Sequence, residues 1–135
     1  MIRFTEFLDE KARTKSEESE PSLDALAERI RSRSAPTKSL LPWIKLARFS
    51  GKPSEKGCLR YDAAVVALTG CEGDYDGGTM PMREAAERLR TAGVAAMHYA
   101  TPSSTAEAPR WRIMAPFSRE CVGDDATLRA TRWNS

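Results

Sequence analysis

The stretch LRYDAAVVALTGCEGDYDGG, Leu59 to Gly78, predicts the centre of the fold. Its first part is rich in Val and Leu and reaches Gly70, which is typical of a strand that enters a hydrophobic core and ends at a glycine. Three carboxylates follow at alternating positions, Glu72, Asp74 and Asp76. Side chains alternate along an extended chain, so these carboxylates share one side and repel one another unless a cation neutralises them.

Further elements are predicted on both sides of this stretch. Downstream, Thr79 is expected to cap a helix that has Pro81 in its first turn and ends at Gly93. VAAMHYA and RWRIMAPF are typical of strands, with the loop TPSSTAEAP between them and Pro116 ending the second. Upstream, Ser22 is expected to cap a helix over SLDALAERIRSR. This order of elements indicates an α/β or α+β domain.

The chain is expected to divide at about residue 35. Residues 9–20 are nearly all polar and bury nothing, so residues 1–35 are predicted to be a flexible segment with one short helix. Residues 36–135 are predicted to form the body. LLPWIKLARF, at the start of this body, is expected to pack across it. A basic and aromatic contact with nucleic acid is the alternative interpretation of that segment.

Composition limits the class of protein. Of 135 residues, 41% are hydrophobic and 30% charged, and the net charge of +2 excludes a strongly basic nucleic-acid binder, so such a role would need local patches. The sequence has no apolar run near the roughly 20 residues of a membrane helix and no recognisable signal peptide. The three cysteines lack metal-binding spacing. A cytoplasmic protein with reduced thiols and no membrane partner is therefore expected.

Three interpretations of the acidic stretch remain open. Clustered carboxylate oxygens suit Mg²⁺, Mn²⁺ or Ca²⁺. The pattern E-x-D-x-D-G matches the start of a calcium-binding EF-hand loop, but Arg83 stands where that loop needs its final glutamate. A second interpretation is a pair of strand-end carboxylates that hold a catalytic metal for phosphoryl transfer. The third is a solvated acidic turn without a ligand.

Two arginines add to the second interpretation. Arg110 and Arg112 flank Trp111, and strand alternation places both guanidinium groups on one face. Two forked donors side by side suit a polyphosphate, although exposed arginines that pair with acidic neighbours would give the same pattern. Carboxylates and arginines in one small domain suggest a site for a metal and a nucleoside triphosphate.

The chain resembles the N-terminal part of archaeo-eukaryotic-type primases, or primase-polymerases, of bacterial plasmids and prophages. The matching pieces run from about Ala35 to Glu120 and are APTKSLLPWIKLARF, KGCLRYDAAVVALTGCEGDYDGGTMP, the helix with its AGVAA ending, HYATPSST and APRWRIMAPFSRE. The resemblance implies an α+β catalytic core with a partial RRM-like sheet flanked by helices. It also implies template-directed nucleotide addition with two divalent metals, Mg²⁺ or Mn²⁺.

The resemblance also assigns roles to residues. Asp74 and Asp76 match the family's catalytic, metal-binding pair, with Glu72 a third acidic residue of the same motif. Arg110 and Arg112 match its nucleotide-binding arginines. The implied partners are a nucleoside triphosphate, a DNA template and a replicative helicase domain or protein.

Two departures from the family pattern affect the expected activity. Ser104 stands where the family has a histidine on the nucleotide's phosphates, and a hydroxyl brings no positive charge. The lone histidine, His98, lies six residues earlier and is expected to be structural, with substitution for the missing histidine as the alternative. A third motif with a further acidic ligand should follow RATRWNS, which resembles the start of the helix leading to it. The chain is thus expected to be a truncated core that is inactive alone.

Three functional hypotheses remain open at this stage. The first is a primase catalytic-core fragment completed by downstream sequence. The second is a non-catalytic nucleotide- or nucleic-acid-binding remnant of such a core. The third is a small metal-stabilised module unrelated to replication.

Overall fold

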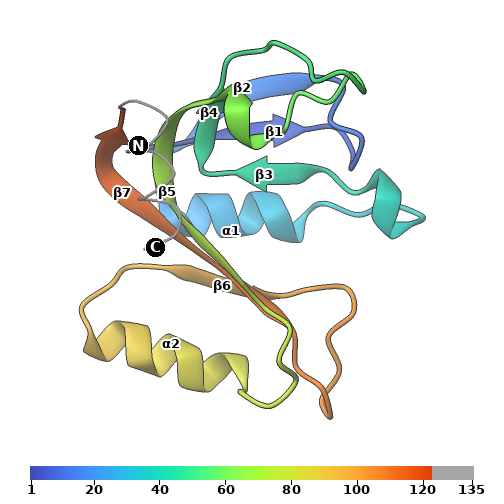
Figure 1. Cartoon of the computed structure of the whole chain (residues 1–135). Coiled ribbons are helices and arrows are strands. Elements are labelled where there is room, and N and C mark those ends of the chain that lie inside the picture. The colour runs from blue at the N-terminus through green and yellow to red at the C-terminus, as the bar shows by residue number, and fades with distance from the viewer. Residues whose placement is uncertain (123–135) are drawn as a thin grey trace.

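Two antiparallel sheets and two helices make up the computed structural model, which describes residues 1–122 (Figure 1). The first sheet has the order β2-β1-β3, with β1 Ile2–Phe7, β2 Lys15–Glu20 and β3 Trp43–Lys45. The second has the order β4-β5-β7-β6, with β4 Ala47–Phe49, β5 Val65–Tyr75, β6 Met97–Ala100 and β7 Trp111–Cys121. The helices are α1 Leu23–Arg31 and α2 Met82–Thr91, and two short 3₁₀ turns cover Lys38–Leu40 and Asp62–Ala64. The expected α+β class is therefore confirmed.

Both predicted helices are present, and one predicted cap is wrong. The Ser22 hydroxyl accepts a hydrogen bond from the Ala25 amide at 3.1 Å, as expected at the start of α1. At α2 the N-cap is Pro81, with no side-chain cap, because the Thr79 hydroxyl bonds the Tyr75 hydroxyl instead. Gly93 follows α2 with a φ of +77°, the left-handed conformation expected of a glycine that ends a helix.

The central strand β5 is longer than the sequence predicts. It does not end at Gly70 but continues through the acidic stretch to Tyr75. Gly70 is needed for a close approach instead, since a Cβ there would lie 2.5 Å from Leu46 Cδ1 and 2.8 Å from the Ala115 carbonyl oxygen. Its pairing partner is Pro116, which lies inside β7 and does not end it. The β5–β7 register shifts between Leu68 and Gly70, and such irregularities are where a sheet tolerates proline.

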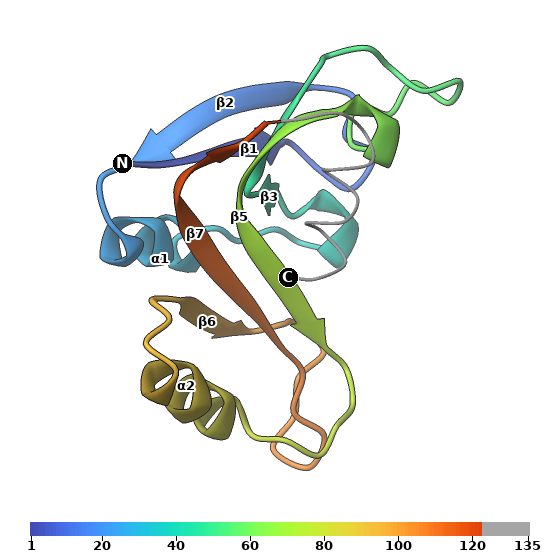
Figure 2. The same ribbon diagram turned by 60° about the vertical axis from the view of Figure 1, so that its left-hand side comes forward.

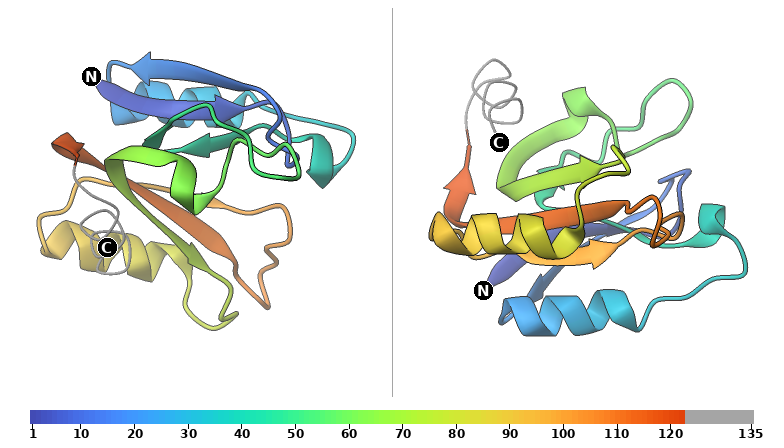
Figure 3. Two further views of the ribbon diagram at one scale, coloured as in Figure 1. Left: turned by 45° about the horizontal axis from the view of Figure 1, so that its top comes forward. Right: turned by 90° about the horizontal axis from the view of Figure 1, so that it is seen from below.

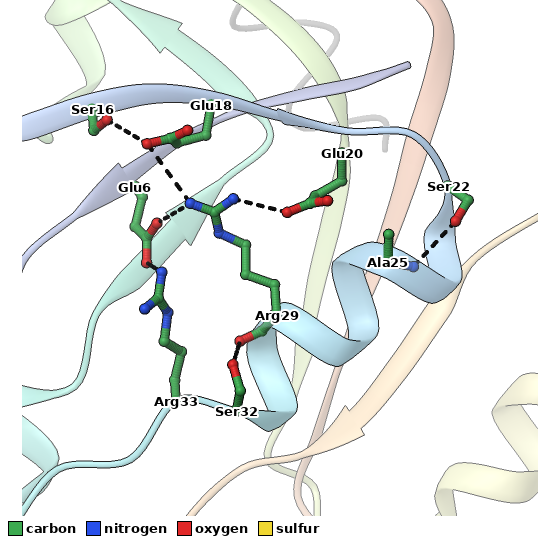
Figure 4. A network of polar contacts seen from close by, with 9 residues as sticks. All are labelled: Glu6, Ser16, Glu18, Glu20, Ser22, Ala25, Arg29, Ser32 and Arg33. Carbon is green, nitrogen blue, oxygen red and sulfur yellow. Dashed lines mark hydrogen bonds and ion pairs between the residues drawn. The ribbon is translucent and has the colours of Figure 1, made fainter.

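The N-terminal sheet was not expected. Residues 15–20 form β2, so the prediction of a flexible segment over residues 9–20 is wrong there. Phe4 and Phe7 of β1 are fully buried and anchor this strand, although the polar residues around them hide the strand pattern in the sequence. β2 itself is held by β1 and by charge pairing with α1. Arg29 of α1 lies 2.8 Å from Glu6 of β1 and 2.9 Å from Glu20 of β2. Figure 4 shows these contacts.

The core consists of two hydrophobic clusters, and each takes residues from both sides of residue 35. One is built on Phe7, Ala12, Ala47, Phe49, Ala64 and Leu68, and the other on Phe4, Leu26, Ile44, Leu46, Met97 and Met114. The segment LLPWIKLARF supplies four of these residues, so the expectation that it packs within the domain is confirmed. β5 and β7 run side by side from the N-terminal sheet toward α2 (Figure 2). α1 contacts β2, and α2 contacts β6 (Figure 3).

The chain passes between the two sheets at Leu46, the single residue that separates β3 from β4. Its carbonyl accepts a hydrogen bond from the Thr69 amide at 2.9 Å. Thr5 of β1 is also buried here, and its hydroxyl donates to the Ala47 carbonyl at 2.7 Å. Within residues 1–122, no helix is long and apolar enough to cross a membrane. The predicted body extends to residue 135, and its last segment, including RATRWNS, lies outside the described residues.

Candidate functional site

A row of three polar side chains crosses the second sheet. Asp74 of β5 pairs in register with Arg112 of β7, which pairs in turn with Tyr99 of β6. The guanidinium group of Arg112 donates to both carboxylate oxygens of Asp74, from Nε at 2.5 Å and from one Nη at 3.4 Å. Its other Nη donates to the Tyr99 hydroxyl at 3.3 Å. The alternation of β7 and β5 thus brings together residues that are 38 positions apart in the sequence.

A cavity of about 370 Å³ lies beside this row, and we call it the Asp74 cavity. Its walls come from the end of α1, the segment that follows it, β3, the ends of β5 and β6, and the residues that precede β7. The charged residues that line it are Arg33, Lys38, Asp74, Asp76, Arg110 and Arg112. Four of the residues singled out from the sequence, two acidic and two basic, therefore face one space.

The charges in the Asp74 cavity are only partly paired. Asp74 and Arg112 pair with each other, and Arg33 reaches Glu6 at 2.7 Å. Among residues 1–122, the side chains of Lys38, Asp76 and Arg110 have no hydrogen bond or ion pair. Two cationic groups and one carboxylate are thus left to interact with a ligand.

Arg112 is held on the wall of the cavity by an aromatic residue as well as by ion pairing. Its guanidinium carbon lies 5.5 Å from the centre of the Trp43 ring, and that of Arg60 lies 4.2 Å from the same ring. Burial lowers the pKa of the Arg112 guanidinium, but the hydrogen bonds that it donates to Asp74 and Tyr99 and its attraction to these groups outweigh this effect, and the pKa is raised overall. Arg112 therefore carries a fixed positive charge at a largely buried position.

Ser104 contributes to the site by binding the backbone of Arg110. Its hydroxyl accepts a hydrogen bond from the Arg110 amide at 2.9 Å, and the Thr101 amide donates to the Arg110 carbonyl at 3.0 Å. These bonds close the loop that presents Arg110. The neighbouring Ser103 lines the Asp74 cavity, whereas Ser104 is not among its lining residues.

Glu72 faces a different space from the two aspartates. It lines a second cavity of about 360 Å³, the Glu72 cavity, together with Lys45, Arg60 and Asp62. One carboxylate oxygen accepts a hydrogen bond from the Leu46 amide at 2.9 Å, and the other lies 3.8 Å from Lys45 Nζ and has no hydrogen bond. Burial raises the pKa of this carboxyl group despite the nearby lysine. Glu72 thus binds the backbone at the crossing between the sheets.

The three predicted carboxylates therefore line two different cavities, Glu72 one of them and Asp74 and Asp76 the other. In the part of the chain that the structure describes, no three His, Cys, Asp or Glu side chains gather in an arrangement that suits a metal ion. Asp74 and Asp76 share the Asp74 cavity with cationic groups. Two carboxylates still fit Mg²⁺ or Mn²⁺ chemically, because Mg²⁺ in proteins commonly binds one or two carboxylates and completes its shell with water and substrate phosphates.

Asp76 is positioned from the opposite face of the sheet. The rings of Tyr75 and Trp111 stack with centroids 4.7 Å apart. The Tyr75 hydroxyl accepts hydrogen bonds from the Thr79 and Met80 amides at 3.1 and 2.8 Å, and Trp111 Nε1 donates to the Met80 carbonyl at 2.9 Å. The hydrogen bond with the Thr79 hydroxyl, followed by those from the Met80 and Thr79 amides, lowers the pKa of Tyr75. Together with the Trp111 bond, these contacts anchor the loop that carries Asp76.

Sequence reasoning missed three residues that line the Asp74 cavity. Tyr99, Lys38 and Ser103 line the Asp74 cavity, but only the pairing of β6 with β7 and the path of the chain after α1 reveal them. His98 precedes Tyr99 in β6 and lines neither of the two cavities.

Comparisons of the chain with protein-family models, with curated proteins and with solved structures give no match.

Proposed function

We propose that the Asp74 cavity binds a nucleoside triphosphate together with Mg²⁺ or Mn²⁺, as the nucleotide site of a primase-type nucleotidyltransferase. One observation carries this proposal. Asp74, Asp76, Arg110 and Arg112, which the sequence had singled out for metal and phosphate binding, line a single cavity. The same proposal includes an RRM-like arrangement of the second sheet. Its proposed partners are a DNA template and a replicative helicase domain or protein.

The charges of the cavity suit this ligand. Asp74 and Asp76 offer hard carboxylate oxygens, and the divalent metal they would hold neutralises phosphate charge. Arg110 and Lys38, whose side chains are unpaired within residues 1–122, donate to the remaining phosphate oxygens. Arg112 adds a fork that fits a phosphate group. The cavity of about 370 Å³ lies within the usual range for small-ligand sites.

Equilibrium titration with a fluorescent triphosphate in the presence of Mn²⁺ tests this proposal. We expect Arg110→Gln to weaken binding by about tenfold, because a charge-assisted hydrogen bond contributes roughly 1.5 kcal/mol or more. Asp76→Asn should weaken the metal-dependent part of the binding. Arg83→Gln, which removes the same charge from an exposed position on α2, should leave the affinity unchanged. Equal losses in Arg110→Gln and Arg83→Gln, or no binding at all, would contradict a site at this cavity.

A non-catalytic nucleotide-binding role is the second candidate. It is favoured by the state of the carboxylates, since Asp74 is paired with Arg112 and Asp76 is the one unpaired carboxylate that lines the cavity among residues 1–122. In-line transfer with two metals needs ligands on both ions. A primer-extension assay with Mn²⁺ tests for catalysis. Extension that Asp76→Asn abolishes would exclude the non-catalytic role, whereas triphosphate binding without extension is expected both of that role and of a primase core that is inactive alone.

A further inference from the structure

We propose that the Asp74–Arg112 ion pair makes cation binding and phosphate binding at the Asp74 cavity depend on each other. This inference rests on the proposed function, because it concerns how the same site fills. Without ligands, each of the two groups already has a partner of opposite charge, so each ligand must compete with that partner.

The geometry of the pair sets up this competition. Both oxygens of the Asp74 carboxylate accept hydrogen bonds from Arg112. The carboxylate remains 53% exposed while the Arg112 side chain is 17% exposed, so a cation can approach Asp74 from the cavity but meets the guanidinium charge directly behind it. Like charges at that separation repel, and partial burial strengthens the repulsion. A cation alone therefore binds Asp74 weakly.

A phosphate group reverses the situation. Its oxygens match the guanidinium fork as well as a carboxylate does, so a bound phosphate draws Arg112 away from Asp74. Tyr99 and Trp43 contact Arg112 independently of Asp74, and these contacts keep the guanidinium at the cavity wall after Asp74 is released. The freed carboxylate then offers both oxygens to a cation. Because coupling between two sites is reciprocal, a bound cation must favour phosphate to the same degree.

Two separate titrations test this coupling without the confounding attraction between metal and phosphate in solution. The first uses Mn²⁺ alone. We expect Arg112→Gln to tighten Mn²⁺ binding by about tenfold, within the usual range of such coupling. Arg110→Gln is the matched control, because it removes the same charge from the same cavity without breaking an ion pair. Its effect should be smaller by about threefold or more.

The second titration uses tripolyphosphate in the presence of a chelator. Asp74→Asn should tighten binding because it releases Arg112, and we expect a gain of about fivefold or more. Asp76→Asn removes an equal charge that has no partner among residues 1–122, so its gain should be clearly smaller. Circular dichroism and thermal melting would verify that each variant folds. Arg112→Lys serves if Arg112→Gln does not fold. Because this variant keeps the net charge of the cavity, a gain in Mn²⁺ affinity over the wild type would report the loss of the fork on Asp74, and no gain would overturn the inference.

The outcomes separate this inference from the proposed function. Equal gains in the two members of each matched pair would mean that only the net charge of the cavity matters, and the inference would be overturned while the site stands. Failure of the wild-type chain to bind labelled triphosphate with Mn²⁺ would overturn both. Larger gains in Arg112→Gln and Asp74→Asn than in their controls support the coupling.

Discussion

Gly70 shows how a single residue fixes the path of two strands. It is buried in β5 opposite Pro116 of β7, with the side chain of Leu46 and the backbone of β7 both within 3 Å of where a Cβ would lie. Sequence reasoning took this glycine for the end of a strand, since glycine weakens strands and often bounds them. The actual reason for it is space, which depends on segments more than 20 residues away and is not visible locally.

We expect Gly70→Ala to destabilise the protein by about 1–3 kcal/mol, the usual cost of overfilling a packed interior. The nearest backbone atom, the Ala115 carbonyl oxygen, is 2.8 Å from the added carbon and cannot move freely. Gly73→Ala is the control, because a Cβ at this position of the same strand meets nothing within 4 Å. Urea unfolding of both variants gives the comparison, and similar midpoints would contradict the close packing at Gly70.

His98 predicts a pH dependence of stability. Burial lowers its pKa below the ordinary value of 6.5, so the unfolded chain binds the proton more readily than the folded one. Stability is therefore complete above that value and falls as the pH drops toward the folded pKa. His98 is the one histidine of the 135 residues, which makes the assignment direct.

The measurement is the free energy of unfolding between about pH 5.5 and about pH 7.5, in the range where histidine titrates. We expect the wild type to lose more stability at the acidic end than His98→Gln, which carries no charge at any pH. Parallel pH profiles for the two proteins would contradict a depressed pKa at His98.

At the scale of elements, residue periodicity predicted the helices, which depend on local sequence, and missed the strand β2, which depends on pairing with β1. The two helices and the alternation of Arg110 with Arg112 follow from residue spacing, and the structure bears them out. β2, with the sequence KSEESE, has no apolar residue to signal a strand. It is a strand because β1 supplies its hydrogen bonds and α1 supplies a cation. In the same way, strand alternation predicts that Glu72 and Asp74 share one face of β5. The Leu46 amide, where the chain crosses between the sheets, instead binds the Glu72 carboxylate away from the Asp74 cavity.

The contact between α1 and the first sheet yields a test at this scale. Arg29 is 19% exposed and serves Glu6, Glu18 and Glu20, so its loss leaves three carboxylates close together. We expect Arg29→Met to cost about 2 kcal/mol, less than for a fully buried pair because the groups remain partly solvated. Arg31→Met, at a side chain 72% exposed, should change stability little. Thermal melting compares them, and equal effects would contradict a structural role for the network in Figure 4.

At the scale of the molecule, the two longest strands of the described residues contribute to both hydrophobic clusters. Leu68 of β5 belongs to one hydrophobic cluster and Met114 of β7 to the other, and the two strands pair along most of their length. Phe4 and Phe7, both on β1, also divide between the clusters. A boundary at residue 35 therefore separates segments that share their buried surface.

We predict a single cooperative unfolding transition for the described part of the chain. Trp43 and Trp111 report from the two sheets, and fluorescence of a Trp133→Phe variant isolates them, since Trp133 lies outside the described residues. The urea midpoint from fluorescence should coincide with that from far-ultraviolet circular dichroism, as two-state unfolding requires. Separate midpoints, with the N-terminal residues lost first, would instead support the division at residue 35.

The outer edge of the first sheet has a consequence for how copies of this chain behave when crowded. Among residues 1–122, β2 is an edge strand, and the free side of an edge strand is the kind of surface on which a second chain can add a strand and begin an aggregate. In the part of the chain that the structure describes, Glu17, Glu18 and Glu20 of this strand pair with only two cations, Lys15 and Arg29, so two copies brought together there would align a surplus of negative charge. The acidic residues that made β2 look like a loop in the sequence thus disfavour the pairing of β2 with the same strand of another molecule.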